Sequence, residues 1–130
     1  MKFSKDFLVT QVEPELRRGL KACGWWTLDR TKLQSSEADY WVFVLQGFAS
    51  RSVDFVIVPP RELLRRLETI HVRQKKIQTY IWVTGGKRCW ETRGLRKSDQ
   101  FLIALGEYKR QSRDFTGWLN AWWPVARLNR

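Results

Sequence analysis

The stretch ADYWVFVLQGFASRSVDFVIVPP, from Ala38 to Pro60, decides the fold class that the sequence predicts. It holds two apolar runs of strand length, residues 40–45 and 53–58, both rich in β-branched and aromatic side chains. The loop QGFASRS between them is short enough for an antiparallel hairpin. Because both runs are almost continuously apolar, we expect two strands that are covered on both faces.

The residues that follow predict a helix and a second hairpin. Pro59 ends the second strand, and Pro60 suits the first turn of a helix. The apolar residues of that helix fall on one face: Leu63, Leu64, Leu67 and Ile70. Residues 77–84 then alternate between apolar and polar side chains, and the following Gly85-Gly86 pair favours a hairpin turn with positive φ.

The remaining elements are predicted from shorter patterns. Residues 6–12 indicate a strand, 14–24 a helix, 25–28 the start of a strand and 29–39 a loop. Residues 98–110 indicate a helix capped by Ser98 or Asp99. A terminal helix over residues 112–128, ended or kinked at Pro124, is predicted from the helical spacing of Phe115, Trp118, Leu119 and Trp122.

Length and composition predict one folded domain, residues 1–130. Hydrophobic residues make up 43% of the chain, which is enough for a sizeable core. No apolar run reaches the length of a membrane span, and the N-terminus lacks a signal-peptide core, so we expect a cytoplasmic protein with no membrane association. Cys23 and Cys89 are expected to be reduced thiols rather than disulfide partners or zinc ligands.

Several stretches together carry a resemblance to a known family. DYWVFVL and VDFVIVPPRELLRRL, followed near the end by RDFTGWLNAWWPVARL, resemble the C-terminal half of small endonuclease-like proteins of the PD-(D/E)xK superfamily. The resemblance covers residues 38–128. It implies an α/β fold in which helices flank a central mixed β-sheet, a restriction-endonuclease-like core that the chain carries in incomplete form.

The family's catalytic motif is absent or degenerate in this chain. In the family, an aspartate and an (Asp/Glu)-x-Lys strand hold a divalent metal that activates water for phosphodiester cleavage. The residues that approximate this motif here are Asp6, Glu13 and Glu15, but no lysine accompanies them and Pro14 interrupts the site. We therefore expect a protein that needs no cofactor and is non-catalytic on its own. The alternative is a metal-dependent nuclease in which Asp6, Glu13 and Glu15 bind Mg²⁺.

The charge of the chain predicts a polyanionic partner. The formal net charge is +11, and two segments are densest in cations. The candidate nucleic-acid-binding residues are Arg65, Arg66, Arg73, Lys75, Lys76, Lys87, Arg88, Arg96 and Lys97. Such side chains neutralise phosphates without reading sequence, and we expect DNA rather than RNA as the partner. The alternative is a solvated helix face and a charged hairpin edge that discourages aggregation.

Aromatic residues and one histidine complete the set of candidates. Tyr80, Trp82 and Trp90 share a hairpin face, where cross-strand core packing is favoured over stacking on bases. Trp118 and Trp122 are expected in the core. Trp123 lies off that stripe and suits a protein partner or a second copy, which defines a third possible function, a small subunit or interaction factor. His71 has no neighbouring acid in the sequence and is interpreted as an ordinary helix-end residue.

Overall fold

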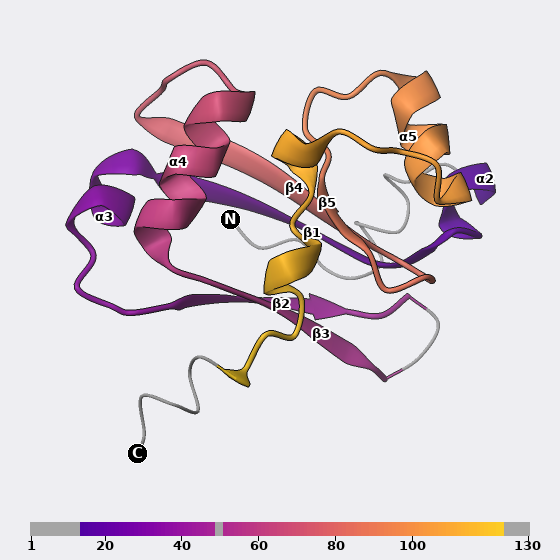
Figure 1. The fold of residues 1–130 in the computed structure, drawn as a ribbon, viewed down its shortest axis with the longest axis horizontal. Helices are drawn as coiled ribbons and strands as arrows, with labels where there is room; N and C mark the ends of the chain where they lie inside the picture. Colours follow the sequence, from indigo (N-terminus) through magenta and orange to yellow (C-terminus); the bar gives the residue numbers. More distant parts are fainter. Residues whose placement is uncertain (1–13, 49–50, 124–130) are drawn as a thin grey trace.

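Two antiparallel sheets organise the protein, as seen in a computed structural model that describes residues 14–48 and 51–123. Strands β1 (Leu20–Asp29), β4 (Lys76–Thr84) and β5 (Cys89–Glu91) form one sheet in the order β1-β4-β5. Strands β2 (Trp41–Gln46) and β3 (Val53–Val58) form the other (Figure 1). The α/β class is confirmed. The prediction of a central mixed sheet is wrong, because every described strand pair is antiparallel.

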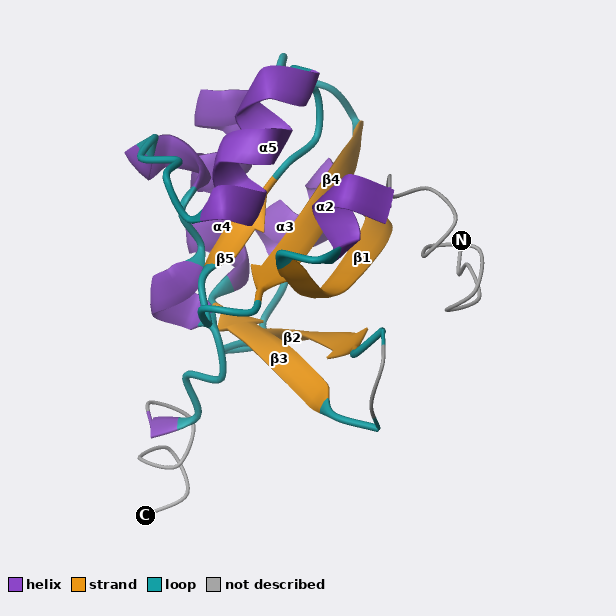
Figure 2. Cartoon of the chain, turned by 90° about the vertical axis from the view of Figure 1, so that its right-hand side faces the viewer, coloured by secondary structure: helices purple, strands orange, loops and turns teal. Residues whose placement is uncertain are grey.

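The hairpin that the opening stretch predicts is confirmed as β2 and β3. Trp41 pairs with Val58 at one end and Gln46 with Val53 at the other. The prediction that both strands are covered on two faces is wrong for β2, where Val44 is 52% exposed while its neighbour Leu45 is buried. The hairpin lies at the periphery as a separate ribbon (Figure 2). Its outer face is open along β2 but covered in part along β3, where Ile57 is buried.

The first core lies between the two sheets and helix α4 (Pro60–Ile70), which confirms the predicted helix. Pro60 occupies its first turn, as the sequence indicated. Leu63, Leu64 and Leu67 are buried against both sheets. Each leucine buried in this way contributes about 1.5–3 kcal/mol relative to an exposed one. This core therefore fixes where α4 ends, which positions the site described below.

The second core covers the other face of the three-stranded sheet. Helices α2 (Pro14–Arg17) and α5 (Lys97–Leu105) contact each other and pack there (Figure 2). Trp82 lies opposite Trp90 and both are buried, which confirms the predicted core pair; Tyr80 on the same face is partly exposed. The predicted helix over residues 98–110 is confirmed as α5 as far as Leu105, where the helix ends before Gly106. Its N-cap is Arg96 without a side-chain hydrogen bond, so the predicted cap is wrong.

Two N-terminal predictions, the helix over residues 14–24 and the loop over residues 29–39, are wrong. The helix over residues 14–24 ends at Arg17, and the chain enters β1 at Leu20. A Cβ at Gly19 would lie 2.2 Å from the backbone oxygen of Ala104, so glycine is needed where α5 approaches. The predicted loop 29–39 contains helix α3 (Arg30–Ser35), which Asp29 caps by accepting from the Lys32 N–H at 3.1 Å. The predicted strand 6–12 lies outside the described residues.

The predicted terminal helix is also wrong in its described part. That part forms two short 3₁₀ helices, η1 (Gln111–Arg113) and η2 (Thr116–Trp118), and Trp122 is 43% exposed rather than in the core. The Arg66 guanidinium donates to the backbone oxygen of Asp114 at 2.8 Å and to two carbonyls before it, which takes acceptors that an α-helix would use internally. No helix in the described part of the chain is long and apolar enough to cross a membrane.

Asn120 fixes the segment after η2 to the edge of β3. Its N–H donates to the Phe55 carbonyl at 2.6 Å, and its Oδ1 accepts from the Phe55 N–H at 2.8 Å. Its Nδ2 donates to the buried Asp54 carboxylate at 3.1 Å, and Lys21 Nζ lies 3.3 Å from the same oxygen. Asn120 has a φ of 53°, a conformation that asparagine adopts more readily than most residues.

Candidate functional site

Only one member of the predicted catalytic trio lies in the part of the chain that the structure describes. Asp6 and Glu13 lie outside the described residues. Glu15 is on α2 and is exposed. Within residues 14–48 and 51–123, no group of three or more histidine, cysteine, aspartate or glutamate side chains is arranged to hold a metal ion. The nuclease alternative therefore stays a prediction without a described metal site.

The predicted basic residues lie at both ends of β4 rather than in one patch. Arg73, Lys75 and Lys76 are at the start of the strand, and Lys87 and Arg88 follow its end (Figure 1). A strand of this length spans roughly 25–30 Å. The turn after β4 places its positive φ at Lys87, with 62°, and at neither Gly85 nor Gly86, so the predicted glycine geometry is wrong.

Ion pairs engage four of these predicted cations. Arg65 pairs with Glu62, Arg73 with Glu68, Lys76 with Asp29 and Arg88 with Asp114. The hydrogen bond from Lys76 and that from the Lys32 N–H lower the pKa of Asp29 to about 2. All four cations are at least half exposed, and exposed pairs of this kind contribute only about 0–1 kcal/mol.

The other predicted cations differ in accessibility. Arg66 is held by backbone carbonyls and lies 5.0 Å from the centre of the Trp118 ring, so its role is structural. Lys97 begins α5. Lys75, Lys87 and Arg96 are exposed and have no acidic partner among the residues that the structure describes. The part of the predicted set that is open to a phosphate is therefore smaller than the sequence indicated.

His71, the single histidine of the chain, contacts a buried acid from a distant strand. It caps the C-terminal end of α4, and its Nε2 lies 3.0 Å from Oε1 of Glu91, which is fully buried. Thr79 Oγ1 donates to the other oxygen of Glu91 at 2.8 Å, and the Tyr80 N–H donates to it at 3.3 Å. Since a carboxylate only accepts hydrogen bonds, this contact places a proton on Nε2 of His71 and leaves Nδ1 for another partner.

Arg113 balances the charge of Glu91 and fixes the chain beside it. Its Nη1 lies 3.0 Å from Glu91 Oε1, and its side chain is 8% exposed. The same nitrogen donates to the backbone oxygen of Arg93. A buried charge is tolerated when it is paired and hydrogen-bonded in this way. The network thus fixes the position of the His71 ring relative to the backbone of Arg93.

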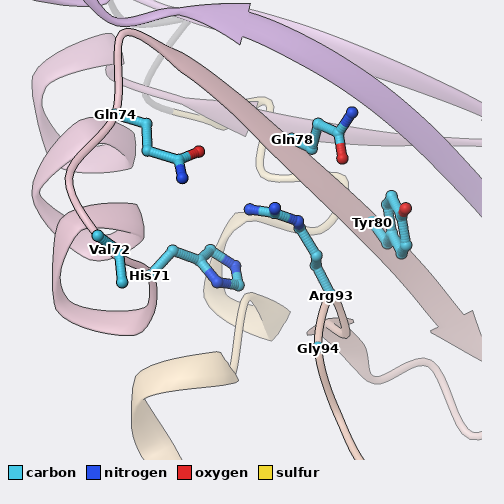
Figure 3. Close-up of a pocket in the computed structure, with 7 residues that line it drawn as sticks. All are labelled: His71, Val72, Gln74, Gln78, Tyr80, Arg93 and Gly94. Atoms are coloured by element: carbon cyan, nitrogen blue, oxygen red, sulfur yellow. The ribbon is translucent and has the colours of Figure 1, made fainter.

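A pocket of about 460 Å³ opens beside this network. Its described lining residues are His71, Val72, Gln74, Gln78, Tyr80, Arg93 and Gly94. The Arg93 guanidinium reaches into the space between His71 and the two glutamine side chains (Figure 3). None of the described lining residues is acidic, and Arg93 has no ion pair among them. The pocket therefore suits an anionic ligand with hydrogen-bonding groups.

One backbone edge of β4 faces this pocket. The Tyr80 N–H donates to Glu91, and the Tyr80 carbonyl accepts from the Thr92 N–H at 2.8 Å, so both groups point toward β5. Gln78, two residues earlier, directs its N–H and C=O to the same side. β5 pairs only with residues 81–83 of β4, and the chain turns away at Gly94, where φ is 78°. Within the described ranges, no strand pairs with Gln78 at this edge.

Sequence reasoning missed this site because its contacts are not local. Glu91 lies 20 positions from His71, so no acid appeared beside the histidine in the sequence. One signal was present. Glu91 shares its strand face with the buried Cys89, and an acid at a core-facing strand position requires a partner.

The two cysteines do not take part in the site. Both are free and buried, in agreement with the expectation of unpaired thiols. Burial raises the pKa of Cys23 to about 12, and burial followed by the carboxylates of Asp114 and Asp54 raises the pKa of Cys89. Since the thiolate is the reactive form, neither cysteine is expected to act as a nucleophile near neutral pH.

Comparison of the chain with protein-family models, with curated proteins and with solved structures finds no match in any of the three. The resemblance to PD-(D/E)xK proteins therefore stays a prediction.

Proposed function

We propose that this protein binds nucleic acid through the phosphates, without reading sequence, as a PD-(D/E)xK-like domain that does not cleave on its own. The net charge of +11 supports an anionic partner. DNA is the partner that we expect first, since the resemblance is to endonuclease-like proteins.

One observation carries this proposal: cations without acidic partners among the described residues lie at the pocket end of β4. Lys75 is exposed and directly precedes β4, and Arg93 lines the pocket. Neither forms an ion pair among the described residues. Arg73 and Lys76 flank Lys75 in the chain, each in an exposed pair that a phosphate can replace at small cost. These four residues, which we call the pocket-end cations, supply phosphate contacts at this end of the strand.

A salt titration on a labelled duplex tests the proposal. Replacement of Arg73, Lys75 and Lys76 by alanine should weaken binding to unrelated sequences to a similar degree. It should also flatten the slope of log K against log salt by about 0.9 for each lost phosphate contact. The matched control removes three exposed cations elsewhere, Arg18, Lys109 and Arg110, and should keep the parental slope. Equal slopes in parent and triple variant, or no binding by the parent at low salt, would overturn the proposal.

A second function is favoured by a separate observation, an apolar face on the outside of the β2–β3 hairpin. Val42, Val44, Val53 and Trp122 are each 40% exposed or more. Trp122 also packs edge-on against Phe55, with ring centres 5.2 Å apart. Exposed apolar residues gathered on one strand face suit a protein partner or a second copy of the chain. Sedimentation analysis of the parent and of Val44→Glu tests the second-copy form; a parent that stays monomeric at high concentration contradicts it.

A further inference from the structure

We infer that the His71 pocket binds one unpaired nucleotide of a nucleic-acid strand, with the phosphate at Arg93 and the base against Tyr80 and Gln78. This inference rests on the proposed function, because it names the part of the nucleic acid that enters the pocket. Phosphate contacts outside the pocket do not require that a nucleotide enters the pocket.

The charged side of the pocket matches a phosphate. Arg93 directs a guanidinium without an acidic partner into the pocket, and a guanidinium binds phosphate oxygens through two hydrogen bonds. The described lining residues include no carboxylate that would repel an anion. One phosphate therefore fits at the Arg93 guanidinium. His71 Nδ1 has no partner among the described residues, and with the proton on Nε2 it accepts a hydrogen bond rather than donating one to the phosphate.

The polar and aromatic side of the pocket matches a base. Gln78 presents a side-chain amide, and its backbone N–H and C=O lie on the open edge of β4. A glutamine amide can both donate to and accept from one base edge. Tyr80 lies two residues further along the same face, where its ring provides a stacking surface. In a duplex the bases are stacked and paired, so an unpaired nucleotide is the form that can use these groups.

The pocket is pre-organised, which reduces the cost of ordering it around a ligand. Glu91 Oε1 lies 3.0 Å from both His71 Nε2 and Arg113 Nη1, and Arg113 Nη1 also donates to the backbone oxygen of Arg93, so this network fixes His71 and the backbone of Arg93. Trp25 packs edge-on against Tyr80, with ring centres 4.8 Å apart, and holds the tyrosine ring in position. Binding groups that are already fixed lose less conformational entropy.

The test measures binding to a labelled single strand of about 12 nucleotides and to the matching duplex, at several salt concentrations. The pocket variant combines Gln78→Ala with Tyr80→Leu and changes no charge. It should weaken single-strand binding roughly 5- to 150-fold, leave duplex binding unchanged and keep the parental salt slope. The matched control, Gln46→Ala with Tyr40→Leu at β2, should bind as the parent does. Tyr80→Phe keeps the ring and should retain binding.

A second variant keeps the test decisive if the pocket variant folds poorly. The Arg93 side chain forms no hydrogen bond or ion pair within the described residues, so Arg93→Gln should fold as the parent does. Arg93→Gln should weaken single-strand binding and flatten the slope of log K against log salt by the amount expected for one lost phosphate contact. A deoxynucleoside monophosphate should also compete with the strand better than inorganic phosphate at equal concentration.

The outcomes separate the two proposals. If the parent binds nucleic acid but the pocket variant and Arg93→Gln both bind single strands as the parent does, the pocket inference is wrong and the proposed function stands. Equal loss on single strand and duplex also contradicts the inference. If the parent binds neither nucleic acid at low salt, the proposed function fails first and the inference falls with it.

Discussion

Two buried carboxylates, Glu91 in β5 and Asp54 in β3, have similar partners but different surroundings. Each carboxylate contacts one arginine or lysine and one side chain from another distant segment: Glu91 has Arg113 and His71, and Asp54 has Lys21 and Asn120. Glu91 also accepts from Thr79. The cations differ in exposure, since the Arg113 side chain is 8% exposed and that of Lys21 is 36% exposed. Glu91 therefore depends on a fully internal ion pair, whereas Asp54 lies at the end of a pair that water can reach.

Asn120 and His71, the second partners of the two carboxylates, differ more than the cations do in how many of their polar groups are engaged. Asn120 uses its side chain and backbone on Asp54 and Phe55, so the Asp54 network fixes the C-terminal segment to β3. His71 contacts Glu91 through one ring nitrogen, Nε2, and lines a pocket. Its other ring nitrogen, Nδ1, has no partner among the described residues. A buried polar network points to function when one of its members keeps a free group at an accessible cavity.

Replacing either carboxylate by alanine should produce the largest losses in the free energy of unfolding, and the loss should be greater at Glu91 than at Asp54. Glu91→Ala leaves Arg113 buried without its partner and should lower the free energy of unfolding by about 3–5 kcal/mol. Asp54→Ala should cost about 1–3 kcal/mol, because Lys21 can turn to water while Asn120 loses one hydrogen bond. Urea unfolding of both variants, with midpoints and m-values compared, measures the difference. A larger loss at Asp54 would contradict the contrast drawn here.

Replacing Asn120 or His71 should change the free energy of unfolding less, and again by unequal amounts. Asn120→Ala should cost about 1–3 kcal/mol, because it removes the acceptor of the Phe55 N–H and puts a less tolerant residue at positive φ. His71→Gln should cost less than about 1 kcal/mol, since Glu91 keeps Arg113, Thr79 and the Tyr80 N–H. The same urea experiment ranks them. If His71→Gln destabilises more than Asn120→Ala, His71 is a structural residue and not part of a binding site.

A third carboxylate, Asp29, is partly buried and pairs with an exposed lysine, and we expect the smallest effect on stability from changing this pair. Its pKa is lowered to about 2, first by the hydrogen bond from Lys76. A lowered pKa contributes stability above the unfolded value near 3.8, and that contribution is lost as the pH falls toward 2. Lys76→Ala should therefore remove a small part of the parent's stability at pH 6 and change it less at pH 2. An equal difference between parent and variant at both pH values would contradict this origin.

The elements that the sequence predicted well depend on local pattern. The β2–β3 hairpin follows from two strand-length apolar runs, and α4 follows from Pro60 and the helical spacing of its leucines. The β4–β5 hairpin follows from the alternation over residues 77–84 and the Gly85-Gly86 pair. These patterns hold because one face of each element packs into a core regardless of which element covers it.

The elements that the sequence missed depend on contacts between distant residues. The helix at 14–24 ends early because α5 approaches Gly19, and the helix at 112–128 fails in its described part because Arg66 binds the carbonyls of that segment. The candidate site has the same character. His71, Glu91 and Arg113 come from three separate segments, and only the fold brings them together.

The central claim is that nucleic acid contacts the pocket end of β4. Backbone amide NMR shifts of the ¹⁵N-labelled protein, recorded as a single-stranded oligonucleotide is added, test it most directly. The account predicts that the largest shifts fall in residues 71–78 and 93–96. In the variant that combines Gln78→Ala with Tyr80→Leu, the same shifts should require a higher concentration of the oligonucleotide. Shifts confined to the turn at residues 85–88, or the absence of any shift at low salt, would contradict it.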